Sequence, residues 1–220
     1  GFVKEKVNPN YLDFSNIKHF TPYDHQKNVC IQLSKNNGGI IDHEVGFGKT
    51  LTMAMLCMTK KKFKVNKKEL IVGFNANYKD IYTVFKQAFP EAKVWLLEEN
   101  DLKKENLKQT LFQIANNNYD AIITSHSSLM KFPISPKSEK QIVQDIIAEC
   151  HAVLSDTDKK LTPAQERKLL QRVNDAEARQ LYLQEALQSK KVNGTLFFDD
   201  LGFDGIIIDE SHYFKNLEFK

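Results

Sequence analysis

The chain has 220 residues, of which 41% are hydrophobic and 27% are charged, and its formal net charge is +3. This length and composition suit one large domain, or one domain with an insertion. The mildly basic balance permits nucleic acid as a partner without requiring it, and no apolar run approaches the ~18 residues of a membrane-spanning helix. The start GFVKEKVNPN is polar and unlike a signal peptide. Because the first residue is glycine, we expect a fragment of a larger protein.

Two compositional features have ordinary interpretations. Cys30, Cys57 and Cys150 are isolated and odd in number, which favours reduced thiols in a cytoplasmic protein over a metal or disulfide role. The lysine-dense stretch 59–68 is typical of a solvated loop after a helix, with a contact to a nucleic-acid backbone as the alternative.

The elements expected between residues 38 and 130 alternate between strands and helices. GGIID (38–42) is short and apolar, which predicts a buried strand, and the glycine loop after it opens a helix over 49–61. Apolar spacing and turn residues predict strands at 69–74, 92–97, 120–125 and 205–210, and helices at 78–89 and 101–118. This order predicts an α/β fold in which a mainly parallel sheet is covered by helices on both faces.

The alternation stops between residues 135 and 191, approximately, where no strand is predicted. One apolar helical stripe there comprises Ile142, Ile146, Cys150 and Val153. A second helix has an N-cap candidate, a proline at its first position and a capping-box glutamine: Thr162, Pro163 and Gln165. Its stripe comprises Leu169, Val173, Ala176, Gln180, Leu183 and Leu187. Two facing stripes predict an inserted antiparallel hairpin, either an arm for a protein partner or a pair folded back on its own domain.

The loop HEVGFGKT (43–50) nearly matches the phosphate-binding pattern G-x-x-x-x-G-K-[ST], with His43 in place of the first glycine. Such a loop needs glycine where φ is positive or where a phosphate approaches the backbone, ahead of a helix N-terminus. Lys49 would lie beside the β and γ phosphates, and the Thr50 hydroxyl would ligate Mg²⁺. The expected nucleotide-binding residues of the loop are Gly46, Phe47, Gly48, Lys49, Thr50 and Leu51.

The strand GIIIDE ends in two carboxylates, Asp209 and Glu210. In a parallel sheet, ligands bind beyond the carboxyl ends of the strands, so this pair and Lys49 are expected at the same edge. Asp209 would hold Mg²⁺, and Glu210 would orient or deprotonate the attacking water. The alternative, a pair of surface carboxylates at a strand end, is weakened by the glycine loop earlier in the chain.

These two motifs resemble those of superfamily 2 helicases and translocases, and most closely the Swi/Snf-type ATPases. The form HEVG and the segment FFDDLGFDGIIIDESHYFKN look like those of large bacterial, phage and mobile-element proteins that join such an ATPase to an adenine-specific DNA methylase-like region. The resemblance implies a RecA-like P-loop NTPase sandwich, ATP and Mg²⁺ as ligands, duplex DNA as the preferred partner, and a cytoplasmic location.

The resemblance also assigns roles to other residues. TPYDHQ (21–26) is similar to the adenine-reading Q motif, with Gln26 as the reader, although Tyr23 replaces the usual arginine. IVGFNANY and IITSHSSLM resemble motifs whose loops touch the nucleic-acid backbone, which points to Asn75, Ser125, His126 and Ser127. His212 occupies the last position of D-E-x-H, which couples the nucleotide site to motion; a packed core histidine is the ordinary alternative.

A second RecA-like lobe, which supplies arginines to the phosphates in this family, is not recognisable before Lys220. Because an arginine finger is worth about 10³–10⁵ in rate, we expect this fragment to bind ATP weakly and to hydrolyse it negligibly. Three alternatives remain at this point: a strand-separating DNA or RNA helicase of another superfamily 2 branch, a nucleotide-gated interaction protein that uses the hairpin, and a small-molecule kinase.

Overall fold

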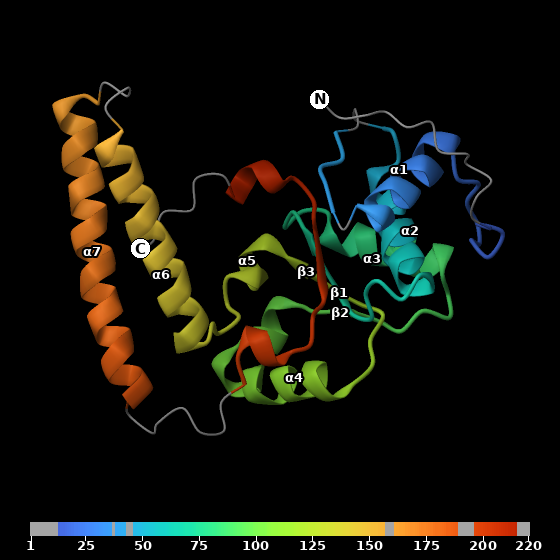
Figure 1. Ribbon diagram of the computed structural model, residues 1–220. Coiled ribbons are helices and arrows are strands. Elements are labelled where there is room, and N and C mark those ends of the chain that lie inside the picture. Colours follow the sequence, from blue (N-terminus) through green and yellow to red (C-terminus); the bar gives the residue numbers. More distant parts are fainter. Residues whose placement is uncertain (1–12, 37, 43–45, 157–160, 189–195, 215–220) are drawn as a thin grey trace. The chain divides into compact units, whose positions relative to one another are not determined.

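The computed structural model describes residues 13–36, 38–42, 46–156, 161–188 and 196–214. The chain forms two compact units, one comprising Gly1–Phe132 with Leu201–Lys220 and the other comprising Pro133–Asp200. The first unit is an α/β sandwich and the second is a pair of long helices (Figure 1). No helix in the described ranges is both long and apolar enough to cross a membrane.

A four-stranded parallel sheet forms the centre of the first unit. Its strands are β1 (Glu69–Gly73), β2 (Val94–Leu96), β3 (Ala121–Ser125) and β4 (Gly205–Ile208), in the order β2-β3-β1-β4. Leu70 of β1 lies opposite both Ile122 of β3 and Ile206 of β4 in the register. Since every strand runs in the same direction, all four carboxyl ends lie at one edge, where the site is expected.

Helices cover both faces of the sheet, as the sequence predicts. Helices α2 (Lys49–Lys62) and α3 (Tyr78–Ala88) share a buried core with Ile71, Ile123 and Ile207 on one face. The alternation of side chains along a strand turns Leu70 and Ile122 to the other face, where α4 (Lys104–Asn116) lies (Figure 1). The predicted α/β sandwich of the RecA-like kind is therefore confirmed.

One predicted strand is wrong. Residues 38–42 form no ladder with any described strand, and β4 pairs only with β1 among the described residues. Gly38 and Gly39 have φ values of 137° and 156°, which side-chain-bearing residues rarely adopt. The apolar run is therefore interrupted at its start, and Ile40 is 86% exposed instead of buried.

Smaller differences concern element boundaries and one missed helix. The helix α1 (Asp24–Lys35) was not predicted, because its apolar face is short and rests on Cys30 and Ile31. The helix expected from residue 101 begins instead at Lys104, after a 3₁₀ turn over Glu99–Leu102 whose capping box uses Asp101.

Much of the lysine-dense stretch is not a solvated loop. Lys60, Lys61 and Lys62 belong to α2, and Lys60 lies buried 3.4 Å from the carboxylate of Glu69. Lys61 forms an ion pair with Asp120, which ends the loop before β3. Lys68 is buried and donates to the carbonyls of Ile114 and Leu201 at 2.6 and 3.0 Å. Burial lowers the pKa of Lys68, against the opposing effect of Asp204.

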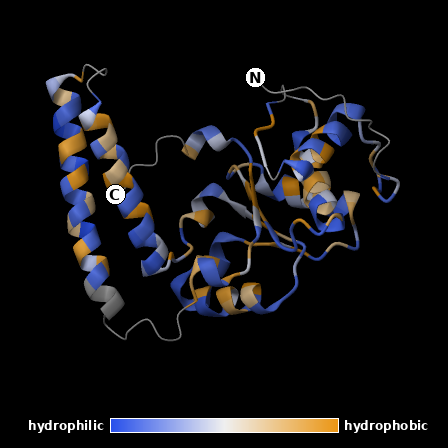
Figure 2. Ribbon diagram, in the orientation of Figure 1, coloured by the Kyte–Doolittle hydropathy of each residue, from blue (hydrophilic) through white to orange (hydrophobic). Residues whose placement is uncertain are grey.

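The helices α6 (Pro136–Ser155) and α7 (Pro163–Gln188) form the second unit. They pack antiparallel, because Arg179 late in α7 pairs with Glu139 early in α6 at 2.6 Å. The predicted capping box is present: the Thr162 amide donates to the Gln165 side chain at 2.9 Å. Hydrophobic residues recur along both helices among hydrophilic ones (Figure 2).

One of the two predicted stripes in this unit needs correction. On α7, Val173 and Leu183 are buried as expected, and the side chain of Leu187 lies outside the described set. On α6, Cys150 is buried as expected, but Ile142 is 38% exposed and its neighbour Val143 is buried instead. Ile146 and Val153 are half-buried, so the stripe differs from the prediction only at its start, where Val143 replaces Ile142; the 3.6-residue period allows this when two adjacent positions are both apolar.

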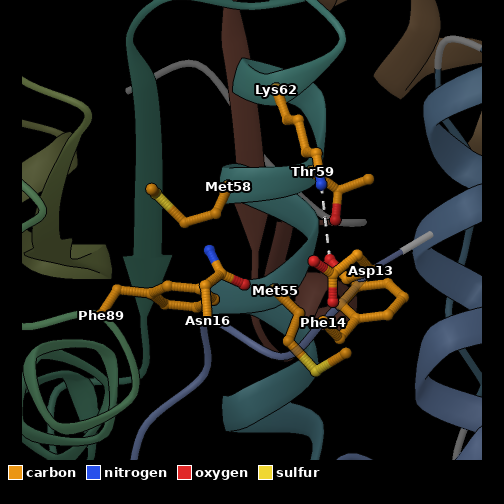
Figure 3. Close-up of a pocket in the computed structure, with 8 residues that line it drawn as sticks. All are labelled: Asp13, Phe14, Asn16, Met55, Met58, Thr59, Lys62 and Phe89. Carbon is orange, nitrogen blue, oxygen red and sulfur yellow. Dashed lines mark hydrogen bonds between the residues drawn. The ribbon is translucent and has the colours of Figure 1, made fainter.

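The described N-terminal segment, residues 13–20, lies across α2 and α3. It encloses a cavity of about 20 Å³ whose walls include Phe14, Met55 and Phe89. Figure 3 shows Lys62 extended toward Asp13, where its ammonium donates to the backbone carbonyl at 3.4 Å. A cavity of this size holds about one water molecule, so it is not a ligand site.

Candidate nucleotide and nucleic-acid site

The glycine loop leads directly into the N-terminus of α2. Gly46 and Gly48 have φ values of 91° and 70°, in the left-handed region that glycine adopts readily. Gly48 is the N-cap residue, and Lys49 begins the helix. The backbone N–H groups of the first helical turn have no partners within the helix, so this end can receive an anion. His43 lies outside the described residues.

The loop is attached to α1 by Gln26. The Gln26 side chain is 1% exposed, and its amide nitrogen donates to the Gly48 carbonyl at 3.1 Å. Its amide oxygen accepts from the Tyr23 backbone at 2.9 Å. Both ends of the predicted adenine reader therefore make contacts within the protein. Adenine reading by Gln26 remains a prediction, and its observed contacts fix the loop to α1.

Aromatic rings lie beside this attachment. The His25 ring stacks on Tyr23 with ring centres 5.6 Å apart, and it meets Phe47 edge-on at 5.4 Å. Tyr23 and Phe47 are 68% and 45% exposed. Leu51, by contrast, is buried in the core, so only its backbone can face a ligand.

The acid pair follows β4 at the carboxyl edge of the sheet. The Asp209 amide still bonds to Val72 of β1 at 2.8 Å, and its carboxylate accepts from Asn77 at 3.1 Å. Glu210 then adopts φ 52°, a left-handed conformation that is uncommon for a residue with a side chain. The chain therefore turns after Asp209, where β4 has ended.

Lys49 and the acid pair line one cavity of about 580 Å³. The same cavity is bounded by residues 38–42, by Met53 of α2 and by β4. Its volume lies in the range of small-molecule sites. Lys49, Asp209 and Glu210 therefore line the same cavity, together with Asp42 and Lys60, and the cavity runs along β4 as far as the turn after the acid pair. The catalytic and binding roles of these residues remain predictions.

Asp209 offers an oxygen ligand of the kind that Mg²⁺ takes. Among the described residues, no three His, Cys, Asp or Glu side chains form a metal-binding group. Mg²⁺ is typically held by one or two carboxylates together with waters and substrate phosphates, and Asp209 provides such a carboxylate. Thr50 is half-buried in the first turn of α2 and is not among the described residues that line the cavity. Its role as a ligand remains a prediction.

The predicted nucleic-acid residues come together after β1 and β3. The Asn75 side chain accepts from the Ser127 amide at 3.2 Å, and the Ser125 and Ser127 hydroxyls are 3.1 Å apart. Asn75 and Ser127 are exposed, while Ser125 is buried and caps the short helix α5 (His126–Leu129). Only part of this set is therefore accessible to a phosphate backbone.

His212 is exposed and is not a core residue. Its Nδ1 lies 3.1 Å from a carboxylate oxygen of Glu210, and its ring centre is 4.4 Å from that of Tyr213. It belongs to a 3₁₀ turn, Ser211–Phe214, that follows the acid pair. A direct contact with Glu210 is compatible with the predicted coupling role, which remains a prediction.

Sequence comparison identifies the family. A family model described as "Probable helicase domain" matches residues 31–220, which include the glycine loop and the acid pair. The chain belongs to this helicase-domain family. Comparison with curated proteins found no match. Helicase domains are, as a class, ATP-hydrolysing enzymes, and the geometry of the cavity agrees with that class.

Several contacts of this helicase domain were not foreseen. Asn77 bonds to Asp209, and His126 reaches the backbone carbonyl of the same residue at 2.8 Å. Phe74, Tyr213 and Phe214 surround the His126 ring. The only sequence signal for Asn77 is its position two residues after Asn75. For the aromatic residues there was none, because their proximity depends on the strand order.

Proposed function

We propose that this helicase domain is the ATP-binding lobe of a DNA-dependent ATPase that translocates on duplex DNA. The observation that carries the proposal is that Lys49, Asp209 and Glu210 line one cavity beside β4. An ammonium can neutralise the charge of a triphosphate, and a paired carboxylate can bring in the metal ion and activate water.

Each residue would have a defined part in hydrolysis. Lys49 would bind the β and γ phosphates, with the backbone N–H groups after Gly48 completing the cradle. Asp209, aided by Thr50, would hold Mg²⁺, which withdraws charge from the phosphate oxygens. Glu210 would accept a proton from the attacking water, or orient that water. A second RecA-like lobe would supply the arginines.

The finer assignment follows from sequence motifs. The resemblance to Swi/Snf-type ATPases favours translocation on duplex DNA over strand separation, and favours an association with a DNA methylase-like region. Contacts to phosphates carry little sequence information, so binding at Asn75 and Ser127 would be largely independent of DNA sequence.

Nucleotide binding by the 220-residue chain tests the central step. We expect a fluorescent ATP analogue with Mg²⁺ to bind weakly, and Lys49→Ala to raise its Kd by about tenfold or more, the equivalent of one charge-assisted contact. Lys108→Ala, which removes an exposed lysine on α4, is the matched control. Equal affinities for the two variants would contradict the proposal.

Assays with a longer chain that carries both lobes test the finer assignment. Displacement of a triplex-forming strand reports translocation on duplex DNA, and unwinding of a forked duplex reports strand separation. We expect ATP-dependent displacement without unwinding, abolished by Glu210→Gln. Unwinding in the same assay would favour a strand-separating helicase instead.

A further inference from the structure

His126 connects two parts of the sheet edge that are not neighbours. It is the first residue after β3, and its Nε2 donates to the Asp209 carbonyl, just after β4, at 2.8 Å. Strand β1 lies between β3 and β4 in the sheet. The imidazole therefore spans the end of β1. A carbonyl oxygen can only accept a hydrogen bond, which places the ring proton on Nε2.

Aromatic rings hold His126 in this orientation. Its ring centre lies 4.8 Å from that of Phe214, 5.9 Å from that of Tyr213 and 6.0 Å from that of Phe74. Phe74 and Tyr213 also stack on each other at 5.0 Å. These rings come from the end of β1 and from the turn after the acid pair, so His126 packs against both segments.

The bonded carbonyl belongs to the peptide that joins Asp209 to Glu210. Rotation of this peptide changes φ of Glu210, which has the strained value of 52°. A left-handed residue with a side chain persists only where its surroundings enforce it. Here the His126 bond fixes the peptide before Glu210, and the Tyr213 amide closes the turn on the Glu210 carbonyl at 3.1 Å. The orientation of this peptide sets the direction in which the Glu210 carboxylate leaves the backbone.

His126 also adjoins, in the backbone, the exposed loop that contains Ser127. Its neighbour Ser127 donates its amide to Asn75 and is exposed. A phosphate that binds at Ser127 and Asn75 would compete for this amide and would move the loop. Because His126 is bonded directly to Ser127 in the backbone, it would move with the loop. Its hydrogen bond to the Asp209 carbonyl would pass that movement to the peptide between the two acids.

We propose that His126 is a positioning residue that transmits nucleic-acid binding at the Asn75–Ser127 loop to Glu210. In this role it acts through the Asp209 carbonyl and does not itself contact the phosphate backbone. The inference rests on the proposed function, since it requires nucleotide hydrolysis that responds to DNA. It differs from the role expected of His212, whose contact is with the Glu210 side chain.

The test compares ATP hydrolysis with and without duplex DNA, and DNA affinity, in the full-length protein. We expect His126→Ala to lower the DNA-stimulated to basal rate ratio by about tenfold, the equivalent of one hydrogen bond, while the Kd for DNA stays within about twofold. His126→Gln, whose side-chain amide can replace the Nε2 donor, should restore most of the ratio. Asn75→Ala should instead raise the Kd for DNA and keep the ratio at saturating DNA.

Other outcomes separate the possible failures. If His126→Ala weakens DNA binding and saturating DNA restores full stimulation, then His126 is a direct contact and the proposal is wrong. If His126→Ala and His126→Gln lower both rates equally, the residue only supports the fold, which also overturns it. If the unaltered protein hydrolyses ATP without any response to DNA, the proposed function fails first. Circular dichroism detects loss of folding in His126→Ala. If that variant does not fold, the ratio of DNA-stimulated to basal rate in His126→Gln is compared with that of the unaltered protein, and a ratio about tenfold lower would contradict the proposal.

Discussion

Gly48 combines two constraints, a positive φ and a close neighbour. Its φ is 70°, and a Cβ at this position would lie 2.6 Å from the amide nitrogen of Gln26. Gly46 also has a positive φ, of 91°, but a Cβ there would meet no atom of the described residues within 4 Å. The pair therefore separates the cost of an unusual backbone conformation from the cost of a steric clash.

We predict that Gly48→Ala is the more damaging of the two substitutions. Both should lower the free energy of unfolding by about 1 kcal/mol, the cost of a side chain in the left-handed region. Gly48→Ala must also displace Gln26, so it should in addition weaken nucleotide binding. Denaturant titration and nucleotide titration of both variants measure the two effects. Equal nucleotide affinities would show that the Gln26 contact does not shape the loop.

Because the Cys30 thiol is buried, we predict that the free energy of unfolding falls as pH rises above about 9. Burial raises the pKa of the Cys30 thiol from 9.0 to about 12. Between these two values the unfolded chain releases a proton that the folded chain keeps, so stability falls as pH rises. The fall attributable to Cys30 should be about 1.4 kcal/mol per pH unit.

The comparison of Cys30→Ala with the unaltered chain isolates this effect. Other groups titrate between pH 9 and 12, but they are common to both proteins, so the difference between the two slopes reports Cys30 alone. Burial also raises the pKa of Cys57, with Glu69 and Asp120 adding to the effect, and Cys57 is present in both. Parallel slopes in urea unfolding would contradict the prediction.

At the scale of elements, a buried polar cluster joins α2 to the amino-terminal ends of the strands. Lys60 lies 3.4 Å from Glu69, and the two side chains are 8% and 2% exposed. Asn66 donates to the same carboxylate oxygen of Glu69 at 2.5 Å. The other oxygen, Oε2, has no hydrogen-bond partner among the described residues. The absence of a side chain at Gly205 leaves room for it, since a Cβ there would lie 2.3 Å away.

We predict that Glu69→Ala strongly destabilises the domain. Removal of one member of a buried pair leaves the other charge unpaired, at a cost of about 3–5 kcal/mol. Glu99→Ala, which breaks the exposed pair of Glu99 with Lys131, is the matched control and should have little effect, because surface pairs contribute little. Urea unfolding measures both. A small loss for Glu69→Ala would show that Lys60 finds another partner or water.

The sequence predicted the elements that are defined by periodic apolar residues. The stripe of Ile81, Val84, Phe85 and Phe89 predicted α3. Val84 is half-buried and the other three are buried. The strand at 38–42 failed because an apolar pattern does not show whether a neighbour is available for hydrogen bonding. Helix α1 was missed because it depends on contacts with α2, which lie beyond the range of local patterns.

The candidate site was predicted only in part, because some of its contacts depend on the order of the strands and not on local patterns. The two motifs, each next to a predicted strand, were sufficient to predict that Lys49 and the acid pair lie near each other, and they line one cavity. The contact from His126 to Asp209 could not be predicted, because it requires that β1 lie between β3 and β4. Strand order is set by packing of the whole sheet, and no single segment encodes it.

At the scale of the whole molecule, the two compact units can be separated experimentally. The Phe132 and Phe203 rings, which flank the helical unit in the sequence, are 6.5 Å apart within the first unit. A short linker can therefore replace Pro133–Asp200 at a small loop-closure cost. In α7, Leu170 and Leu181 are 48% and 63% exposed, so removal of this unit also removes apolar surface.

We predict that the chain with a Gly-Ser linker in place of Pro133–Asp200 folds cooperatively. Its nucleotide affinity should stay within about twofold of the unaltered chain, because none of the described residues that line the cavity lies in the excised unit. The control inserts the same linker after Phe132 and retains the helices. Loss of nucleotide binding in the excised form alone would show that the helical unit contributes to the site.

The outer edge of β4 has a consequence for handling the isolated chain. Beyond β1, no described strand pairs with β4, Ile206 is 48% exposed, and the adjoining Ile40 is 86% exposed. A strand edge that no neighbouring strand covers is a template for pairing between molecules. At high protein concentration this edge would favour self-association, and a nucleotide bound in the adjoining cavity would shield it.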